Sequence, residues 1–321
     1  MNGQQARNVV VPRPRAHGGD APLLARALGV DPDEILDLSM TMNPLASDVV
    51  PLVRECAESV RRYPDADFAT DALAEAIGIE ANRLLLTNGG AEAIALVAME
   101  LGDAQVVEPE FSLWRRHLGS GSRITAKAGL GRVRSNPNNP IGVLARDDEL
   151  AQCWDEAFFP LATGRWTRGD AERGAIVVGS LTKLFACPGL RLGYVIAPDI
   201  AIRQRLAERQ SMWSVSSLAL GVLPALIASS QLEDWASEIS LLRSSLAEIF
   251  ITRGFLVEVA DAPWILVRDA AWLRDPLARQ MILVRDCVSF GLEGTIRIAV
   301  PESKFFPRIA TVLDQILEVH R

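Results

Sequence analysis

The sequence contains few of the side chains that usually bind transition metals. Its 321 residues include three histidines and four cysteines, and no two cysteines form a CxxC pair. A structural zinc site or a disulfide framework would need paired cysteines or a cysteine and histidine cluster. We therefore expect reduced thiols and no metal site, as in a cytoplasmic protein.

The sequence also lacks long runs of a single chemical character. The net charge is −7 and no long basic run occurs, so nucleic acid is not expected as the main partner. The first residues have no signal-peptide core, and the most apolar later stretch, residues 218–228, is interrupted by Pro224. We expect a cytoplasmic protein without a membrane segment. Because the net charge is negative, an anionic small substrate would need local arginines.

Short apolar runs alternate regularly with helical patterns. Strands expected at residues 83–86, 105–107 and 132–135 are separated by helices, which predicts an α/β domain with a mainly parallel sheet. After a long amphipathic helix at residues 232–251 the pattern becomes that of a small α+β domain. The predicted parts are an N-terminal arm with part of the small domain at 1–44, a large domain at 45–230 and a small C-terminal domain at 231–321.

Three further elements are predicted from the spacing of apolar residues. A helix is expected at residues 48–62 with one buried face, a second at residues 146–152, and a strand near residue 124.

The most informative stretch is residues 175–195, AIVVGSLTKLFACPGLRLGYV. A β-branched run ends at Gly179 and leads into a polar turn with Ser180, Thr182 and Lys183. Arg191 follows eight residues after the lysine. An amine beside hydroxyl groups and a guanidinium suits a phosphorylated carbonyl compound such as pyridoxal phosphate. The alternative is a lysine that is simply exposed to solvent, as most are.

Four weaker patterns also point to ligand binding, and three of them have a structural alternative. The turn Thr87–Gly90 opens a helix and could bind an anion, although such turns are often only tight connections. Asp155 ends a short apolar strand and could pair with a ring nitrogen or cap a helix. The asparagines of residues 136–142 suggest a polar ligand. His17, before two glycines, could equally belong to a flexible turn.

Together these patterns resemble a known family. The order SLTK, then PGLRLGY, is similar to the lysine signature of fold-type I pyridoxal-phosphate enzymes, the aspartate aminotransferase superfamily, and the resemblance spans residues 17–300. It implies a large cofactor-binding domain with a mainly parallel sheet of the seven-stranded type and a small α+β domain. Only fourteen residues separate Pro140 from Asp155, and the stretch from Pro109 to Asn136 is also short, so one or two strands are expected to be clipped or absent.

The resemblance also implies how pyridoxal phosphate would be held. Lys183 would carry the cofactor covalently, Asp155 would pair with the pyridinium nitrogen, Asn139 would bind the phenolic oxygen and Phe111 would stack on the ring. The phosphate would be bound by Gly90, Ala91, Ser180, Arg191 and Tyr63, the last from the neighbouring subunit. A homodimer with shared active sites is therefore expected.

Further motifs are most similar to threonine-phosphate decarboxylases of cobalamin biosynthesis and to the related histidinol-phosphate aminotransferases. They are HGGD, LDLSMTMNP, TNGGAEAI, MWSVSSLA and ILVRDCVSFGL. By this resemblance the substrate, a small phosphorylated amino acid, would contact His17, Asn43 and Arg285, and Arg297 would bind its α-carboxylate. The expected reaction is decarboxylation of O-phospho-L-threonine. The alternatives are an aminotransferase, another pyridoxal-phosphate lyase and a catalytically silent scaffold.

Overall fold

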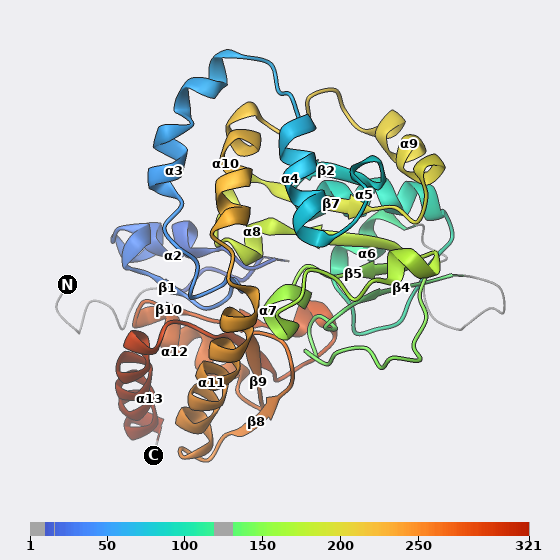
Figure 1. Cartoon of the computed structure of the whole chain (residues 1–321). Helices are drawn as coiled ribbons and strands as arrows, with labels where there is room; N and C mark the ends of the chain where they lie inside the picture. Colours follow the sequence, from blue (N-terminus) through green and yellow to red (C-terminus); the bar gives the residue numbers. More distant parts are fainter. Residues whose placement is uncertain (1–9, 16, 119–130, 321) are drawn as a thin grey trace. The chain divides into compact units, whose positions relative to one another are not determined.

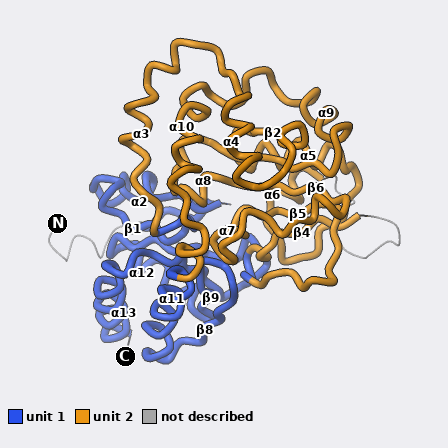
Figure 2. The backbone as a smooth tube through the Cα atoms, viewed as in Figure 1, with its two compact units in different colours: residues 1–44, 140–142, 238–321 blue, residues 45–139, 143–237 orange. Residues whose placement is uncertain are grey.

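The chain divides into two compact units (Figure 2). The computed structural model describes residues 10–15, 17–118 and 131–320. Unit 1 comprises residues 1–44, 140–142 and 238–321, and unit 2 comprises residues 45–139 and 143–237. Helix α11, Leu232–Ile251, begins in unit 2 and ends in unit 1. Within the described ranges, no helix combines the length and the apolar character needed to cross a membrane.

Unit 2 is built on a six-stranded sheet (Figure 1). Its strands, in spatial order, are β2 (Leu84–Asn88), β7 (Leu192–Ile196), β6 (Ile176–Ser180), β5 (Cys153–Asp155), β4 (Arg132–Ser135) and β3 (Gln105–Val106). Strand β7 runs antiparallel to both of its neighbours, and β3 to β6 are parallel. The predicted α/β class with a mainly parallel sheet is confirmed. Within the described residues this sheet has six strands rather than seven, and the strand expected near residue 124 lies outside them.

Helices cover both faces of this sheet (Figure 1). On one face α5 (Gly89–Leu101), α6 (Ser112–His117) and α9 (Ile200–Arg209) share a core with alternate strand residues such as Val133, Cys153 and Val178. Helix α4 (Asp67–Ile77) packs on β2, and α10 (Ser217–Ala228) packs on α4. The short helices α3 (Val50–Glu55), α7 (Phe159–Thr163) and α8 (Leu181–Leu184) complete the unit.

Local sequence explains where several of these helices begin and end. The side chain of Asp199 accepts the Ile202 N–H at 2.7 Å and starts α9, and Ser216 accepts the Ala219 N–H at 3.2 Å and starts α10. Gly78 ends α4 in the left-handed region, with φ of 82°, which glycine adopts without strain.

Unit 1 combines the N-terminal and C-terminal parts of the chain. Its antiparallel sheet has the order β11 (Arg285–Asp286), β12 (Ile296–Ala299), β9 (Trp264–Arg268) and β8 (Leu256–Val259). The N-terminal strand β1 (Leu36–Asp37) pairs in parallel with β10 (Ile282–Leu283). Helices α2 (Ala21–Leu28), α12 (Arg274–Arg279) and α13 (Phe306–His320) complete an α+β arrangement.

The helix expected at residues 48–62 differs from the prediction in two ways. It breaks at Cys56 into α3 and a 3-10 helix, Ala57–Arg61. Neither piece contains a buried residue, and Val50 and Val60 are 44% and 63% exposed. The prediction that one face of this helix is buried is therefore wrong for a single copy of the chain.

The helix expected at residues 146–152 is also wrong, because this stretch forms turns and coil. The guanidinium of Arg168 replaces helical hydrogen bonds: its Nη2 donates to the carbonyls of Arg146, Asp147 and Glu149 at 2.9, 3.0 and 3.2 Å. The same group lies 4.8 Å from the ring centroid of the buried Trp154. One arginine thus holds the connection into β5.

We predict that Arg168→Ala lowers the free energy of unfolding by roughly 2–4 kcal/mol, because three carbonyls lose a charged donor and a buried ring loses its cover. Arg165→Ala is the matched control, since Arg165 is exposed and lies three residues away. The control should change stability by less than about 0.5 kcal/mol in the same urea titration. Equal stability of the two variants would refute the role given to Arg168.

Candidate active site

The lysine singled out in the sequence lies where a strand turns into a helix. Strand β6 ends at Ser180, and Lys183 is half-buried on α8. The hydroxyl oxygens of Ser180 and Thr182 lie 2.8 Å apart. The amine-bearing residue is therefore preceded by two linked hydroxyl groups at the end of a central strand.

Glycines bring a second strand end close to Ser180. A Cβ on Gly193 would lie 2.5 Å from the carbonyl carbon of Gly89 and 2.6 Å from the Gly90 nitrogen, distances that no side chain could occupy. A Cβ on Gly90 would lie 3.4 Å from the Ser180 Cβ. The start of α5 therefore meets β7 in close contact because position 193 is glycine, and Gly90 lies at ordinary contact distance from Ser180 at the end of β6.

This meeting point has the chemistry of a phosphate cradle. The first N–H groups of a helix have no intrahelical acceptor, and α5 is 13 residues long, so Gly90 and Ala91 present donors and a positive dipole end. Gly89, with φ of 73°, makes room for Arg191, because a Cβ there would lie 2.5 Å from the Arg191 Nη2. Backbone donors, the Ser180 hydroxyl and a guanidinium thus converge, as a bound phosphate requires.

Asp155 is a buried carboxylate at the end of β5. Its oxygens accept the indole N–H of Trp114 at 3.1 Å and the Ala157 N–H at 3.2 Å. Burial raises the pKa of Asp155 to about 6, although both donors act in the opposite direction. Among the described residues no lysine, arginine or histidine forms an ion pair with it. A protonated ring nitrogen would supply the missing positive charge, so the residues of unit 2 fit pyridoxal phosphate at both its phosphate and its ring nitrogen.

The two other residues expected at the cofactor ring flank the same strand ends. Phe111 is half-buried and begins α6, and Asn139 is buried in the turn after β4. Ser135, at the end of β4, is the register partner of Asp155, and the Asn136 N–H donates to the Asp155 carbonyl at 2.8 Å. The asparagine turn therefore starts directly beside Asp155.

Unit 1 contains a pair of buried arginines. Arg285 and Arg297 are register partners on the antiparallel strands β11 and β12, and both are at least 93% buried. Their guanidinium carbons lie 5.3 and 5.6 Å from the ring centroid of Phe290. Burial lowers the pKa of both, that of Arg297 to about 10, and the charge of Arg285 adds to the effect on Arg297. Like charges directly opposite in a sheet are destabilising unless an anion balances them.

The early glycine motif lies near one of these arginines. Gly18, Asp20, Ser39 and Arg285 line one small hollow in unit 1. The Arg285 guanidinium also donates to the Arg15 carbonyl at 3.0 Å. His17, next to Gly18, is exposed, and Asn43 is buried in the same unit.

Tyr63 differs from the other candidate residues of unit 2. Its side chain is 78% exposed, and its ring stacks against that of Trp213 with centroids 4.6 Å apart. A side chain this exposed is accessible to a neighbouring subunit.

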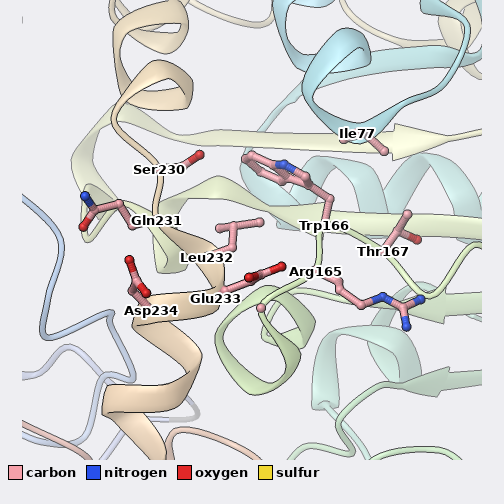
Figure 3. A pocket seen from close by; sticks show the side chains of 10 residues that line it. Ile77, Arg165, Trp166, Thr167, Ser230, Gln231, Leu232, Glu233 and Asp234 are labelled. Atoms are coloured by element: carbon pink, nitrogen blue, oxygen red, sulfur yellow. The ribbon is translucent and has the colours of Figure 1, made fainter.

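A separate hollow of about 580 Å³ in unit 2 contains none of the candidate residues (Figure 3). Its lining comes from the end of α4, the loop after α7 and the start of α11, with Trp166 and Glu233 among the labelled side chains. Lys183, Asp155 and Gly90 do not line this hollow, so it is separate from the expected cofactor site.

One contributor to this site was not anticipated from the sequence: Trp114 donates to Asp155, and no local pattern signals this contact. Thr182, a hydroxyl residue of the lysine motif, pairs with Ser180. A simpler signal was available in the composition: Lys183 is one of only three lysines, with Lys127 and Lys304.

Comparisons with known proteins agree with this geometry. The family model for aminotransferase class I and II matches residues 133–305. The chain is 30% identical to the threonine-phosphate decarboxylase of Salmonella typhimurium, over 94% of this chain and 96% of that protein. It is 27% identical to a histidinol-phosphate aminotransferase of Halobacterium salinarum, over 92% and 94% of the two chains. A crystal structure of histidinol-phosphate aminotransferase from Sinorhizobium meliloti has a TM-score of 0.81 at 16% identity, covering 100% of this chain and 98% of that one.

A second buried carboxyl, Glu156, follows Asp155. Its oxygens accept the Arg168 N–H at 3.2 and 3.3 Å, and burial raises its pKa to about 7, with the Asp170 carboxylate acting in the same direction. A carboxyl whose pKa is higher in the folded state favours folding while it is protonated. That contribution is present below the unfolded pKa and is lost as the pH rises through about 7.

We therefore predict how Glu156→Gln changes the free energy of unfolding of the cofactor-free protein. Relative to wild type, this free energy should be higher by roughly 2 kcal/mol more at pH 8 than at pH 5.5. Glutamine cannot ionise, so the variant does not pay the cost of a buried charge at high pH. Urea unfolding at both pH values gives the difference, with Glu172→Gln as an exposed control of the same unit. A stability difference that is the same at both pH values would contradict the prediction.

Proposed function

The chain belongs to the aminotransferase class I and II family, a family of pyridoxal-phosphate enzymes, and on that premise we propose that it decarboxylates O-phospho-L-threonine. The products would be carbon dioxide and (R)-1-aminopropan-2-ol phosphate, a step that would serve cobalamin biosynthesis. The decarboxylase of Salmonella typhimurium, similar over nearly the whole chain, supports this choice.

The buried arginine pair is the observation that carries the proposal. Two guanidinium groups on facing strand positions suit a ligand with two anions, and a phosphorylated amino acid brings a phosphate and a carboxylate. We assign the α-carboxylate to Arg297 and the phosphate to Arg285 with His17, and we expect Asn43 to contact the same substrate. Holding both anions fixes the orientation of Cα, which decides whether carbon dioxide or a proton is lost.

The cofactor would be held by residues of unit 2. Gly90, Ala91, Ser180 and Arg191 would bind its phosphate, and Asp155 its ring nitrogen. Phe111 would cover the ring, and Asn139 would donate to the phenolic oxygen. When bound, pyridoxal phosphate supplies an electron-accepting ring for the bond that breaks at Cα. We assign to the Lys183 amine the covalent attachment and the delivery of the proton that replaces the carboxylate.

An aminotransferase acting on a phosphorylated compound is the second candidate. The similarity to the histidinol-phosphate aminotransferase of Halobacterium salinarum, 27% over 92% of the chain, favours it. Such an enzyme would use the same lysine and the same arginine for the carboxylate of its amino-acid donor. The two reactions therefore differ in their products rather than in these residues.

We expect the purified protein with added pyridoxal phosphate to release carbon dioxide from O-phospho-L-threonine and to form the amino alcohol phosphate in equal amount. Lys183→Ala should lower this rate at least about a thousandfold, because the attached amine is lost. Mass spectrometry of the products and trapped carbon dioxide measure the reaction. A 2-oxo acid without carbon dioxide would support the aminotransferase instead, and a wild-type protein without any cofactor absorbance would support a silent scaffold.

A homodimer with shared active sites is the assembly we propose. Exposed apolar side chains of unit 2 support it. Val60, Tyr63 and Phe68 lie close in the sequence, as do Met212 and Trp213, and the rings of Tyr63 and Trp213 are in contact. Exposed apolar side chains that gather on one surface often mark an interface. A second copy would cover them and place Tyr63 at its neighbour's cofactor phosphate. We also place the enzyme in the cytoplasm, because its four cysteines are free thiols.

If Tyr63 serves the neighbouring subunit, two inactive variants should complement each other. We predict that mixing and reassembling Tyr63→Ala and Lys183→Ala proteins restores up to about a quarter of the wild-type activity, because one site of each hybrid dimer is intact. Native mass spectrometry would confirm that hybrids form, and each variant dissociated and reassembled alone serves as control. Hybrids that stay inactive would exclude a shared site.

A further inference from the structure

Glu110 is a buried carboxylate in the loop before Phe111. Only 1% of its surface is exposed, and no cation forms an ion pair with it among the residues that the structure describes. A carboxylate in such a place costs free energy unless hydrogen bonds compensate. The hydrogen-bond partners of Glu110 therefore indicate its role.

Among the described residues, the hydrogen-bond donors to Glu110 are neutral groups from two segments of the chain, Phe111 and residues 135–138. Its Oε2 accepts the Ser135 N–H at 2.8 Å and the Asn138 amide at 3.5 Å. Its Oε1 accepts the Phe111 N–H at 2.7 Å and the Ser135 hydroxyl. The carboxylate thus joins Phe111 to the end of β4 and to the asparagine turn.

The short neighbouring strand explains why Ser135 needs this partner. Strand β3 pairs with β4 only through Gln105 and Val106, so its ladder stops two residues before Ser135. The Ser135 N–H points away from β5, because the next N–H, that of Asn136, bonds to β5. Glu110 occupies the place of the missing strand and accepts a donor that would otherwise be buried without a partner.

These contacts all lead to residues expected at the cofactor ring. Phe111 follows Glu110 directly, and Asn139 follows Asn138. Ser135 is the register partner of Asp155, and Trp114 of the same α6 segment donates to Asp155. Burial raises the pKa of Glu110 to about 7, and the charge of Asp155 acts in the same direction to a smaller extent.

We propose that Glu110 is a positioning residue for the cofactor ring, which fixes Phe111 and the Asn138–Asn139 turn through one buried carboxylate. The inference rests on the proposed binding of pyridoxal phosphate in unit 2. It adds a residue that touches neither cofactor nor substrate but sets the place of those that do.

The test compares Glu110→Gln with Glu149→Gln. Glutamine at 110 keeps one acceptor oxygen, and its amide would face the N–H of Ser135 or Phe111. Glu149 is a matched control, because this partly buried carboxylate also holds β4, through Arg132 and Arg134, without contacting Phe111 or Asn138. The measurements are the dissociation constant of pyridoxal phosphate, the circular dichroism in the cofactor absorption band and the melting temperature of the cofactor-free protein.

We expect Glu110→Gln to weaken cofactor binding about tenfold or more and to reduce the cofactor dichroism. Glu149→Gln should lower the melting temperature while leaving both cofactor readouts at wild-type values. Ser135→Ala, which removes one donor and keeps the carboxylate, should act in the direction of Glu110→Gln and decides the matter if that variant does not fold.

Three outcomes are informative in different ways. Wild-type cofactor affinity and dichroism in both Glu110→Gln and Ser135→Ala would overturn the role of Glu110 alone. A wild-type protein that binds no pyridoxal phosphate would overturn the proposed function together with this inference. An equal loss of cofactor binding in Glu149→Gln would mean that Glu110 only stabilises β4 in general, and it would also overturn the proposal.

Discussion

The cost of burying charge is the constraint on which the functional parts of this protein depend. Unit 1 buries two arginines on facing strand positions, and unit 2 buries Asp155, Glu156 and Glu110 near neighbouring strand ends. The pKa values of these groups are displaced in the direction that burial dictates, downward for the arginines and upward for the acids. A fold selected for stability alone would have little use for them. Under the proposed function, Asp155 and the arginine pair would take up opposite charge from a ligand, whereas Glu156 and Glu110 accept hydrogen bonds from the protein itself.

Sheet geometry turns these buried groups into a site. In unit 2 the parallel strands β4, β5 and β6 end at Ser135, Asp155 and Ser180, so chemistry from distant parts of the sequence gathers at one edge of the sheet. Glycines then let the start of α5 approach the reversed strand β7. Asp155, Ser180 and Gly193 occupy positions that strand pairing fixes, and Lys183 and Gly90 lie on helices that begin directly after paired strands. This arrangement gives the rigidity that a cofactor site needs.

Features with local causes could be predicted from the sequence, and features with distant causes could not. The strand before Ser180 and the helix at residues 232–251 follow from nearby residues, and both are confirmed. The expected helix at 146–152 is replaced by coil because Arg168, some twenty residues later, takes its carbonyls. The exposed face of α3 and the burial of Glu110 likewise depend on contacts that no local pattern encodes. The roles assigned to individual site residues stay predictions.

Under the proposed function, strand register also bears on which substrates can bind both arginines. Cross-strand partners in an antiparallel sheet have Cα atoms about 4.5–5.5 Å apart and side chains on the same face, and Arg285 and Arg297 both contact the ring of Phe290. Two anions bound to this pair would therefore meet one face of one sheet. In O-phospho-L-threonine only Cα, Cβ and the ester oxygen separate the carboxylate from the phosphate. One molecule of this substrate would then bring both anions to the same face, which is the arrangement that the register of β11 and β12 favours.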